Sequence, residues 1–423
     1  MTGTSDRSAI AYLAPEIPAL SETFVYEEIH GVERMGLRVV PIGLRRPAVP
    51  ARDQKALADR VTVLYAQPGI LLLLAGLIQA PVFGKKLAPA LRYLLADMLT
   101  CGIHRMNGWK LGYQFFAAIR LARILKREKC VHLHVHFAHT PAQIAMYASA
   151  LSGVPFTITA HANDIFERGL LLRQKADRAI RMLTISEHNR QFLENLGIPK
   201  DRLAVVRCGV SLSARAKPER VTHGHSFVIG TLGRMVEKKG IDVLIRAVSV
   251  LKASGHDLEL RIAGDGPLNA DLKRIVAELE VADITRFEGK LPHHRIADWL
   301  QGLDVFVLAC KKSKAGDMDG IPLVLMEAMS QSVPVISTRL SGIPELVRHE
   351  DTGLLAEPED IADLARQIER LIGSEDLRAR IAERAGKHVM DEFGQPLNLD
   401  RLIRCFELPS RGAVRKLNSH AHD

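Results

Sequence analysis

Short apolar runs rich in β-branched residues alternate along the chain with longer stretches of helical periodicity. Such runs are typical of strands buried in a parallel sheet, and such stretches are typical of the helices that connect them. In the first half we predict strands over Ile10–Ala14, Arg38–Leu44, Val131–Val135, Phe156–Ala160, Met182–Ser186 and Leu203–Val206. In the second half we predict strands over Phe227–Leu232, Leu258–Ala263, Ile284–Glu288, Val305–Ala309, Val333–Thr338 and Gly353–Ala356. Each set fits a doubly wound α/β sheet, which binds ligands at the carboxyl ends of its strands.

The two sets of strands predict two domains, because 423 residues exceed the roughly 250–300 that one hydrophobic core supports. The polar segment SLSARAKPERVTHGHS, residues 211–226, separates the sets and indicates an interdomain linker. The expected parts are an amino-terminal Rossmann-like domain over 1–212, a carboxyl-terminal Rossmann-like domain over 213–387, a helix over 388–408 that crosses back to the first domain, and a tail over 409–423. Residues 60–115 fit no strand–helix unit and predict a helical insertion.

The most apolar part of this insertion is Gly69–Ala80, GILLLLAGLIQA, which ends at Pro81. As a helix it would be about 18 Å long, so we expect it to be too short for the roughly 30 Å hydrocarbon core of a bilayer. Residues 34–129 carry 17 Lys and Arg against 4 Asp and Glu. This excess suits an anionic lipid surface, nucleic acid or a phosphorylated substrate, and it also suits a solvated basic face. The apolar stretch itself is either an interfacial helix followed by Lys85 and Lys86 or a helix buried in the first domain.

The composition, with 47% hydrophobic and 25% charged residues, is that of an ordinary soluble protein. The five cysteines are widely spaced, and none forms a pair with zinc-site spacing, so we expect free thiols in a reducing compartment. The first residues lack the basic and apolar regions of a signal peptide. We therefore expect a cytoplasmic location, with peripheral binding at the inner face of the cytoplasmic membrane if the apolar stretch is interfacial.

The densest chemical signal is Asp317–Glu327, DMDGIPLVLME, followed by AMSQSVPVIST and SGIPELV. Gly320 and Pro322 indicate a turn into a helix over Ile321–Gln331, with proline near its first position. The free N–H groups at the start of this helix form a ready anion site. Glu327 lies in the middle of the apolar helix, where a carboxylate needs polar partners such as ribose hydroxyls.

A second constellation is Gly230–Gly240, GTLGRMVEKKG, at the end of the second domain's first strand. A glycine-containing turn that carries Arg234 and Lys239 can place two cations on a diphosphate, with Arg as a planar fork and Lys as a point charge. A turn that is merely exposed to solvent could contain the same residues. We therefore base the interpretation on the presence of this turn together with the Asp319 segment.

A third element is Thr159–Phe166, TAHANDIF, directly after a first-domain strand. A histidine at the carboxyl end of a parallel strand faces the ligand crevice, and His161 has this position. His136 ends the preceding strand in the same way.

Two patterns raise the question of a metal. Asp317 and Asp319 form a D-x-D triplet, but we assign Asp319 to the pair that it forms with Glu327. The other pattern is the group His132, His134, His136 and His139. Period-2 spacing puts the first three on one face of a strand, but no carboxylate cluster joins them in the sequence. We therefore predict no metal site and give these histidines structural or substrate-contacting roles.

These segments together resemble the retaining glycosyltransferases of family 4, whose α/β fold, called GT-B, has two facing Rossmann-like domains with parallel sheets and a cleft between them. The second half carries GTLGRMVEKKG, LRIAGDGP, FEGKLP, DGIPLVLMEAMSQSVPVIST, SGIPELV and TGLLAEP in the family's order. The first half carries LSETFVYEEI and PFTITAHANDIF, which resemble the bacterial exopolysaccharide branch, including colanic-acid-type transferases. The resemblance covers residues 8–390 and is weakest across 45–115.

The resemblance implies a UDP- or GDP-linked sugar donor held by the second domain, with no cofactor and no metal requirement. It implies that the donor diphosphate is bound by Arg234, Lys239 and Gly233, and the ribose by Glu327. The transferred sugar would contact Asp319 and the backbone of Gly320, Ile321, Pro322 and Leu323. The base pocket would contain Asp265, Gly266, Lys290 and Leu291. His161 would lie beside the reacting carbon, with His136 and Glu22 on the acceptor side.

Sugar transfer develops negative charge on the leaving phosphate, which two cations and a helix amino-terminus stabilise without a metal. No second carboxylate in the first domain stands out as a covalent nucleophile, so we favour same-face attack by the acceptor hydroxyl. The resemblance implies retention of configuration and an acceptor that is a lipid-linked saccharide or an oligosaccharide, with no nucleic-acid partner. The alternatives are a GT-B-type epimerase or phosphorylase and a non-catalytic sugar-nucleotide-binding or scaffold subunit, and turnover of a donor separates them.

Two positions depart from the family pattern. Most members have Glu where this chain has Asp319, and the shorter side chain bears on donor preference. The loop LAPEIPALSETF lacks the Gly-Gly pair that many members carry there, which leaves its acceptor and phosphate contacts open.

Overall fold

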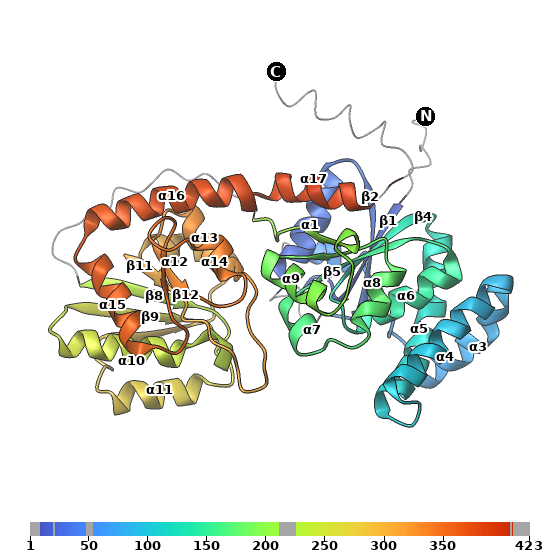
Figure 1. Ribbon diagram of the computed structural model, residues 1–423, viewed down its shortest axis with the longest axis horizontal. Coiled ribbons are helices and arrows are strands. Elements are labelled where there is room, and N and C mark those ends of the chain that lie inside the picture. Colours follow the sequence, from blue (N-terminus) through green and yellow to red (C-terminus); the bar gives the residue numbers. More distant parts are fainter. Residues whose placement is uncertain (1–8, 20–21, 48–53, 211–225, 407, 409–423) are drawn as a thin grey trace, which may run out of the picture. The chain divides into compact units, whose positions relative to one another are not determined.

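The computed structural model describes residues 9–19, 22–47, 54–210, 226–406 and 408. The predicted linker, apart from Ser226, and the predicted tail lie outside these residues. The described chain divides into two compact units (Figure 1). The first unit holds the described residues up to 185, residues 190–209 and the described residues from 395 onward. The second unit holds residues 186–189, 210 and 226–394.

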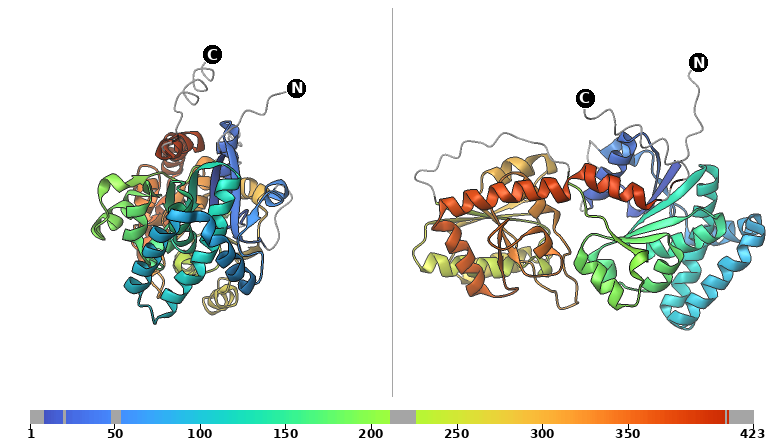
Figure 2. Two further views of the ribbon diagram at one scale, coloured as in Figure 1. Left: turned by 90° about the vertical axis from the view of Figure 1, so that its right-hand side faces the viewer. Right: turned by 45° about the horizontal axis from the view of Figure 1, so that its top comes forward.

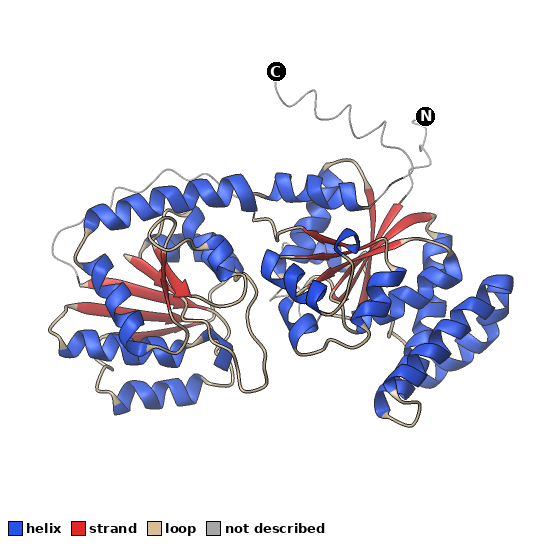
Figure 3. Cartoon of the chain, viewed as in Figure 1, coloured by secondary structure: helices blue, strands red, loops and turns tan. Residues whose placement is uncertain are grey.

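The first unit is built on a seven-stranded parallel sheet in the order β3-β2-β1-β4-β5-β6-β7. Its strands are β1 (Ala9–Glu16), β2 (Arg38–Arg45), β3 (Thr62–Val63), β4 (Cys130–His136), β5 (Phe156–Ala160), β6 (Arg181–Thr184) and β7 (Leu203–Val205). Helices cover the sheet on its faces (Figure 3), and all five residues of β5 are therefore buried. The strand order reverses between β1 and β4, where such sheets bind ligands.

The helices of the first unit include one that comes from the far end of the chain. They are α1 (Thr23–Arg34), α2 (Lys55–Ala58), α3 (Gly69–Gln79), α4 (Leu87–Cys101), α5 (Met106–Arg127), α6 (Thr140–Ser152), α7 (Ala162–Phe166), α8 (Leu172–Arg178), α9 (Glu187–Asn195) and α17 (Gln395–Cys405), with 3-10 turns η2 (Ala80–Lys86) and η3 (Lys200–Arg202). Helix α17 packs on α1 so closely that a Cβ at Gly31 would lie 2.3 Å from Cδ1 of Leu399. Two helices, α16 (Glu375–Phe393) and α17, stand where a single helix over 388–408 was predicted.

The second unit contains a six-stranded parallel sheet in the order β10-β9-β8-β11-β12-β13. Its strands are β8 (Phe227–Leu232), β9 (Leu258–Ala263), β10 (Thr285–Gly289), β11 (Val305–Val307), β12 (Val335–Thr338) and β13 (Leu354–Ala356). Its helices are η4 (Glu237–Lys239), α10 (Ile241–Ala253), α11 (Asn269–Glu278), α12 (His293–Gln301), α13 (Leu323–Ser330), α14 (Ile343–Leu346), α15 (Ile361–Ile372) and α16 (Glu375–Phe393). The strand order of this sheet reverses between β8 and β11.

Both sheets confirm the predicted fold class of two doubly wound α/β units. Every predicted strand overlaps a strand of the structure, and β5, β8 and β9 match the prediction residue for residue. Among the described residues the prediction missed only β3, whose two residues are too few to show a pattern.

Helices α3 and α4 form an outer layer on α5 and α6, away from the sheet of the first unit (Figures 1 and 2). Only Leu72 and Gly76 of α3, and Ala90 and Asp97 of α4, are buried. The alternative in which the apolar stretch is a helix buried in the first domain is therefore wrong.

By length and composition, the segment Gly69–Cys101 is a candidate membrane span with a mean hydropathy of 1.6, and 17% of its most apolar window is buried. This segment is long enough only because α4 continues beyond Pro81, whereas the predicted stretch itself forms α3, which ends at Gln79. The backbone, however, turns at Gly84, where φ is 52° and ψ is −127°. This break leaves two separate helices, of about 17 and about 23 Å at 1.5 Å per residue.

Candidate functional site

The loops after β8, β9 and β11 meet at the strand reversal of the second sheet, and glycines allow their close contact. A Cβ at Gly240, whose φ is +61°, would lie 1.7 Å from the carbonyl oxygen of Ala309, just after β11. A Cβ at Gly264, whose φ is +118°, would lie 1.9 Å from the carbonyl oxygen of Gly233. The loop after β8 is therefore held against its neighbours at the place where a parallel sheet of this order binds a ligand.

This loop carries the two cations that the sequence assigns to a diphosphate. Nζ of Lys239, at the end of η4, lies 2.7 Å from Oδ2 of Asp319. Gly233 lies beside the same lysine, since a Cβ there would be 3.5 Å from Cε of Lys239. Arg234 is exposed, and its guanidinium has no ion-pair or hydrogen-bond partner within the described chain. The structure thus brings Lys239, Gly233 and Asp319 together and leaves Arg234 open to solvent.

The carboxylates of the D-x-D triplet are both paired with lysine. Nζ of Lys238 lies 2.9 Å from Oδ2 of Asp317 and 3.4 Å from Oδ1 of Asp319. Burial alone would raise the pKa of Asp319, but Lys239 and Lys238 hold it below its ordinary value, so this carboxylate is ionised. Burial works against the charged form of Lys239, yet Asp319 raises its pKa above the ordinary value. Lys238 was not among the predicted site residues, although the Lys-Lys pair in GTLGRMVEKKG was a signal for it.

The segment before α13 presents backbone donors. Gly320, Ile321 and Pro322 are buried, and Pro322 caps the helix in an extended conformation with φ −66° and ψ 126°. The helix therefore begins at Leu323 and ends at Ser330, and the longer prediction of Ile321–Gln331 is corrected at both ends. The N–H groups of its first turn lack carbonyl partners within the helix and can bind an anion.

Glu327 has the polar partner that its position on an apolar helix requires. Its Oε1 lies 3.7 Å from Nε2 of His293, the first residue of α12, and its side chain is 26% exposed. The sequence analysis did not identify His293, because nothing in the sequence relates the start of α12 to the middle of α13.

The residues predicted for a base pocket lie in the loops after β9 and β10, two neighbouring strands. Nζ of Lys290 is 3.6 Å from Oδ2 of Asp265, and the N–H of Gly266 donates to Oδ1 of Asp265 at 2.8 Å. Hydrogen bonds from Gly266 and from Asn269 lower the pKa of Asp265. Leu291 is half-buried beside the exposed Lys290. The predicted donor-side residues of the second unit therefore lie in segments that follow β8, β9, β10 and β11, with Leu323 and Glu327 on α13.

His161 lies at the amino-terminal cap of α7, directly after β5. The N–H of Asp164 donates to the His161 side chain, and Oδ1 of Asp164 accepts the N–H of His161 at 2.9 Å. Burial lowers the pKa of His161 well below its ordinary value, so its ring is neutral. Nε2 is the ring nitrogen without a partner among the described residues, and Nδ1 is therefore the acceptor. The neutral ring thus carries its proton on Nε2, ready to donate.

Two buried charged side chains fix the loop beside His161. Asp164 also accepts the N–H of Ala138 on its Oδ2. Nζ of Lys175 donates to the carbonyl of Ala138 at 2.5 Å and to that of Leu170. Burial raises the pKa of Asp164 to about 7 and lowers that of Lys175 to about 7, while each group opposes the shift of the other. The sequence analysis missed both residues, although Asp164 has the spacing of a capping box with His161.

The alternate histidines of β4 lie on one face of the sheet, as their spacing predicts. Nδ1 of His134 lies 2.8 Å from Oγ1 of Thr157. Nε2 of His134 and Nε2 of His136 lie 3.5 Å and 3.1 Å from Oε1 of Glu28, on α1. No carboxylate cluster near these histidines was expected from the sequence, and a single carboxylate, Glu28, reaches two of them from a helix about 100 residues away in sequence. The rings of His136 and His161 stack with their centroids 5.8 Å apart.

Glu22, assigned with His136 to the acceptor side, precedes α1. Burial raises the pKa of Glu22 to about 7, while His136 opposes this shift. Its Oε2 is buried without a partner in the described structure. The structure therefore places Glu22 in the electrostatic range of His136, which in turn stacks on His161.

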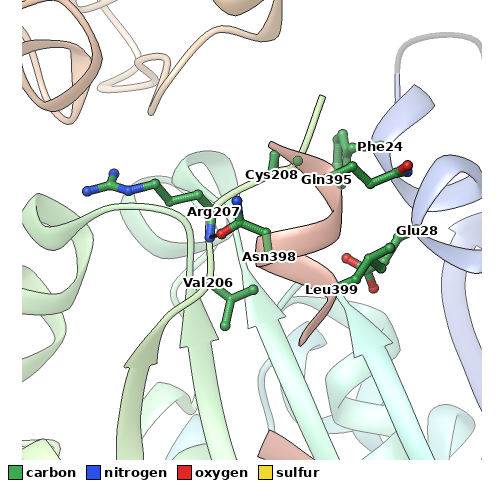
Figure 4. A pocket seen from close by; sticks show the side chains of 9 residues that line it. Phe24, Glu28, Val206, Arg207, Cys208, Gln395, Asn398 and Leu399 are labelled. Atoms are coloured by element: carbon green, nitrogen blue, oxygen red, sulfur yellow. Dashed lines mark hydrogen bonds between the residues drawn. The ribbon is translucent and has the colours of Figure 1, made fainter. Parts of the chain in front are cut away.

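A small pocket lies beside this cluster, between α1, the segment after β7 and α17 (Figure 4). Its walls are Phe24, Glu28, Val206, Arg207, Cys208, Gly209, Gln395, Asn398 and Leu399. Oδ1 of Asn398 accepts the N–H of Arg207 at 3.2 Å, which ties α17 to the strand-end segment. No motif in the sequence indicates this pocket, because its walls come from three distant segments.

Comparisons with known proteins agree on the kind of protein. Residues 214–388 match the family described as "Glycosyl transferases group 1", and residues 100–214 match the family described as "Glycosyltransferase Family 4". The chain is 30% identical over 410 residues to the putative colanic acid biosynthesis glycosyltransferase WcaL of Escherichia coli K12, covering 91% of this chain and 96% of that protein. It is 32% identical over 281 residues to the amylovoran biosynthesis glycosyltransferase AmsK of Erwinia amylovora, covering 65% of this chain and 69% of that protein.

Solved structures share the fold at low sequence identity. Anabaena Alr3699/HepE in complex with UDP has a TM-score of 0.70 and 17% identity, covering 94% of this chain and 98% of that chain. A glycosyltransferase from Rickettsia africae ESF-5 has a TM-score of 0.69 and 17% identity, covering 95% of this chain and 98% of that chain. With the two parallel sheets described above, these likenesses show that the fold is GT-B.

Proposed function

Because the chain belongs to the family 4 glycosyltransferases, we propose that it transfers a sugar from a nucleoside-diphosphate donor to an acceptor in exopolysaccharide biosynthesis. The observation that carries the proposal is the assembly of a cationic loop, a helix amino-terminus and a helix carboxylate at the strand reversal of the second sheet. These groups complement the diphosphate and the sugar hydroxyls of such a donor. The names of WcaL and AmsK, which refer to colanic acid and amylovoran biosynthesis, support the exopolysaccharide assignment.

In the proposed donor complex, the loop after β8 holds the diphosphate. Lys239 approaches it as a point charge, and Arg234, whose guanidinium is exposed and unpaired in the described chain, adds a planar fork. Glu327 accepts hydrogen bonds from the ribose, next to His293. The base contacts the loops after β9 and β10, beside Asp265.

The transferred sugar binds to Asp319 and to the backbone of Gly320–Leu323. Asp319 is ionised and therefore only accepts hydrogen bonds, which suits sugar hydroxyls. Its side chain is one methylene shorter than the Glu of most family members. We infer that the sugar lies closer to the backbone of this segment than it does in those members, which favours a different set of sugars.

The leaving phosphate is stabilised by Arg234, Lys239 and the amino-terminus of α13. The pairing of Asp317 and Asp319 with Lys238 and Lys239 supports transfer without a metal at the diphosphate, because ammonium groups already neutralise these carboxylates. We propose same-face attack by the acceptor hydroxyl with retention of configuration, in which the leaving phosphate takes the acceptor's proton.

His161 contributes a hydrogen-bond donor to this reaction. Its Nε2–H has no partner within the described chain, and Asp164 fixes the residue, with its backbone N–H paired to the ring and its side chain accepting the backbone N–H of His161. A neutral, oriented donor of this kind can hold a sugar hydroxyl without titrating near neutral pH. On the acceptor side, the family resemblance adds His136 and Glu22.

We further propose that the acceptor is a lipid-linked saccharide and that the protein binds the inner face of the cytoplasmic membrane. The binding surface, which we call the outer helical surface, comprises residues 69–113 of α3, η2, α4 and the start of α5. Fourteen of its large apolar side chains are 37–78% exposed: Ile70, Leu71, Leu74, Leu77, Ile78, Val82, Leu91, Tyr93, Leu95, Leu99, Ile103, Met106, Trp109 and Tyr113. An apolar area of this size on a soluble protein marks a binding surface.

The charges on the outer helical surface suit an anionic leaflet. Its exposed cations are Lys85, Lys86, Arg92, Arg105 and Lys110. Between residues 66 and 127 the one carboxylate, Asp97, is 1% exposed and forms an ion pair with Arg178. No exposed carboxylate therefore opposes an anionic surface there, and each cation near such a surface contributes about 1 kcal/mol.

An interfacial position fits this surface better than a membrane span. A span through Gly69–Cys101 would bury Lys85 and Lys86 at its centre, next to the backbone break at Gly84. Charged side chains near the centre of a bilayer cost about 2.5–3.5 kcal/mol each on insertion scales. Lying flat, the apolar side chains enter the headgroup boundary while the lysines meet lipid phosphates.

Co-sedimentation with vesicles that contain anionic lipid tests the membrane proposal. Wild-type protein should bind at low salt and bind less at high salt. Leu77→Asp and Ile78→Asp should weaken binding without unfolding, because both side chains are more than 60% exposed, whereas Leu72 belongs to the core. Met390→Asp is the matched control, since Met390 is 62% exposed in the second unit. Equal recovery in the supernatant with and without vesicles would contradict the proposal.

Thermal shift with a panel of nucleotide sugars tests the donor proposal. A ligand that binds only the folded state stabilises it by RT ln(1 + [L]/Kd), or about 2.7 kcal/mol at 100 times Kd. We expect one class, UDP- or GDP-linked, to raise the melting temperature, and Glu327→Gln to reduce that shift. A panel in which no nucleotide sugar raises it would contradict the proposal.

A further inference from the structure

A cluster of metal-ligand side chains lies on the face of the first sheet that α1 and α17 cover. Nε2 of His134, Nε2 of His136 and Oε1 of Glu28 all lie within 4.8 Å of one another. The two rings are 0% and 1% exposed, and Glu28 is 19% exposed. The cluster is far in sequence from the residues assigned to the donor diphosphate, and nothing in the proposed reaction uses Glu28 or His134.

We propose that Glu28, His134 and His136 bind a divalent cation of the zinc type. Two imidazoles and one carboxylate form a ligand set that Zn²⁺ uses in proteins, with a fourth position left for water. Mg²⁺ and Ca²⁺ prefer oxygen ligands alone, so two buried imidazoles select against them. His136 is then a ligand of the ion, so its effect on the acceptor side depends on the bound ion.

The hydrogen bonds around His134 agree with this role. Thr157 lies 2.8 Å from Nδ1 of His134 and 2.9 Å from Nε2 of His132. If Nδ1–H of His134 donates to Thr157, the Thr157 hydroxyl donates to His132, and the lone pair of His134 Nε2 accepts from the Thr159 hydroxyl at 3.2 Å while it also faces the Glu28 carboxylate at 3.5 Å. A cation relieves that repulsion, and a metal-bound histidine ordinarily donates its other N–H in this way. In the opposite tautomer, Nε2–H donates to Thr159 beside the Glu28 carboxylate, and no metal is needed.

Unpaired buried atoms around the cluster also indicate a missing ligand. Oε2 of Glu22 and Nδ1 of His136 are buried without partners in the described structure. The phenol of Tyr12 lies next to Glu28, and burial and Glu28 together raise its pKa well above the ordinary range, so it is neutral. The water molecules bound to a cation would form hydrogen bonds with these buried atoms. The charge of the cation would offset the negative charge of the Glu22 and Glu28 carboxylates.

The pocket in Figure 4 gives an ion access to this cluster. Glu28 is one of the nine residues that line it and is 19% exposed, so the carboxylate can be reached from outside while the histidines behind it stay buried. An entry path is one of the requirements of a credible metal site, together with suitable ligands and outer hydrogen bonds.

Metal uptake by the full-length, tag-free protein tests the proposal without any activity assay. The protein is freed of metal by dialysis against a chelator and titrated with Zn²⁺ in competition with a chromophoric chelator. Bound zinc is then counted by elemental analysis. We expect one tightly bound Zn²⁺ per chain, and visible absorption bands of a tetrahedral site when Co²⁺ replaces it. Glu28→Gln and His136→Asn should each weaken binding by at least about 100-fold, more than the loss of an outer-shell partner does.

His30→Asn is the matched control, since His30 lies on the same helix, is 43% exposed and pairs only at 3.5 Å with Glu33. It should bind zinc as the wild type does. The proposal would be overturned if the wild-type protein retained no zinc, or if Glu28→Gln bound zinc like the wild type. The histidines and Glu28 would then form a hydrogen-bond network without a metal. If circular dichroism shows that a variant does not fold, the Co²⁺ spectrum of the wild type decides alone, because the absence of tetrahedral bands overturns the site.

Discussion

Replacing Lys239 by alanine should slow sugar transfer about 100-fold. In the proposed complex, its ammonium is one of the charges closest to the developing negative charge on the leaving phosphate. Removal of a single electrostatic stabiliser typically lowers kcat by about 10²–10³. We expect the lower end, because Arg234 remains in the same loop. A loss of 100-fold corresponds to about 2.7 kcal/mol of transition-state stabilisation at 1.36 kcal/mol per tenfold change.

The fold should survive this substitution. Lys239 lies 2.7 Å from Asp319, and the loss of a buried pair partner can cost about 3–5 kcal/mol when the remaining charge is left alone. Here Lys238 stays 3.4 Å from the same carboxylate, and the Asp319 side chain is 13% exposed. We therefore expect a loss of only about 1–2 kcal/mol in the free energy of unfolding, below the range for an abandoned buried charge.

The assay is the initial rate of nucleoside-diphosphate release at saturating acceptor, with kcat and KM determined separately. Lys239→Arg should recover part of the rate because it restores the charge. Lys252→Ala, which removes an exposed lysine paired with Asp283 in the same unit, should leave the rate unchanged. Wild-type turnover by Lys239→Ala, or by the double variant with Arg234→Ala, would refute the assignment of these cations to the diphosphate.

Three further outcomes are expected. Transfer should survive EDTA, because lysines already neutralise Asp317 and Asp319, and a complete loss of rate that Mn²⁺ or Mg²⁺ restores would make these carboxylates metal ligands. His161→Asn should lower kcat by about 100-fold with little change in the melting temperature, and a change in KM alone would remove His161 from the reacting centre. Asp97→Ala should lower the free energy of unfolding by about 3–5 kcal/mol, because it leaves the buried end of Arg178 without its two bonds of 2.6 and 2.8 Å. Urea unfolding measures this loss, and an unchanged midpoint would contradict it.

The fold could be predicted because buried parallel strands appear in the sequence as continuous apolar runs. The strand over Phe156–Ala160 has every side chain buried, and its predicted limits are those of the structure. The start of α13 could be predicted only to within two residues. Proline is favoured both just inside a helix and in the extended residue before it, and Pro322 has the second position.

The site could be predicted where the fold itself brings residues together. Lys239 and Asp319 follow two neighbouring strands, so both residues lie at the same edge of the sheet and come into contact there. Glu28 and His293 could not be found in this way, since their contacts depend on the direction of side chains from helices distant in sequence. The outer helical surface was underestimated because Pro81 was taken as the end of a pattern that continues in α4.

Transfer of labelled sugar into lipid tests the central claim most directly. Wild-type protein is incubated with the radiolabelled nucleotide sugar that gives the largest thermal shift and with a lipid extract from an exopolysaccharide-producing bacterium. The organic phase is then extracted and counted. We predict time-dependent label in the organic phase, matched by released nucleoside diphosphate and reduced about 100-fold by Lys239→Ala. If wild-type protein binds the donor but yields neither labelled lipid nor nucleoside diphosphate, the chain is a binding subunit and not a transferase.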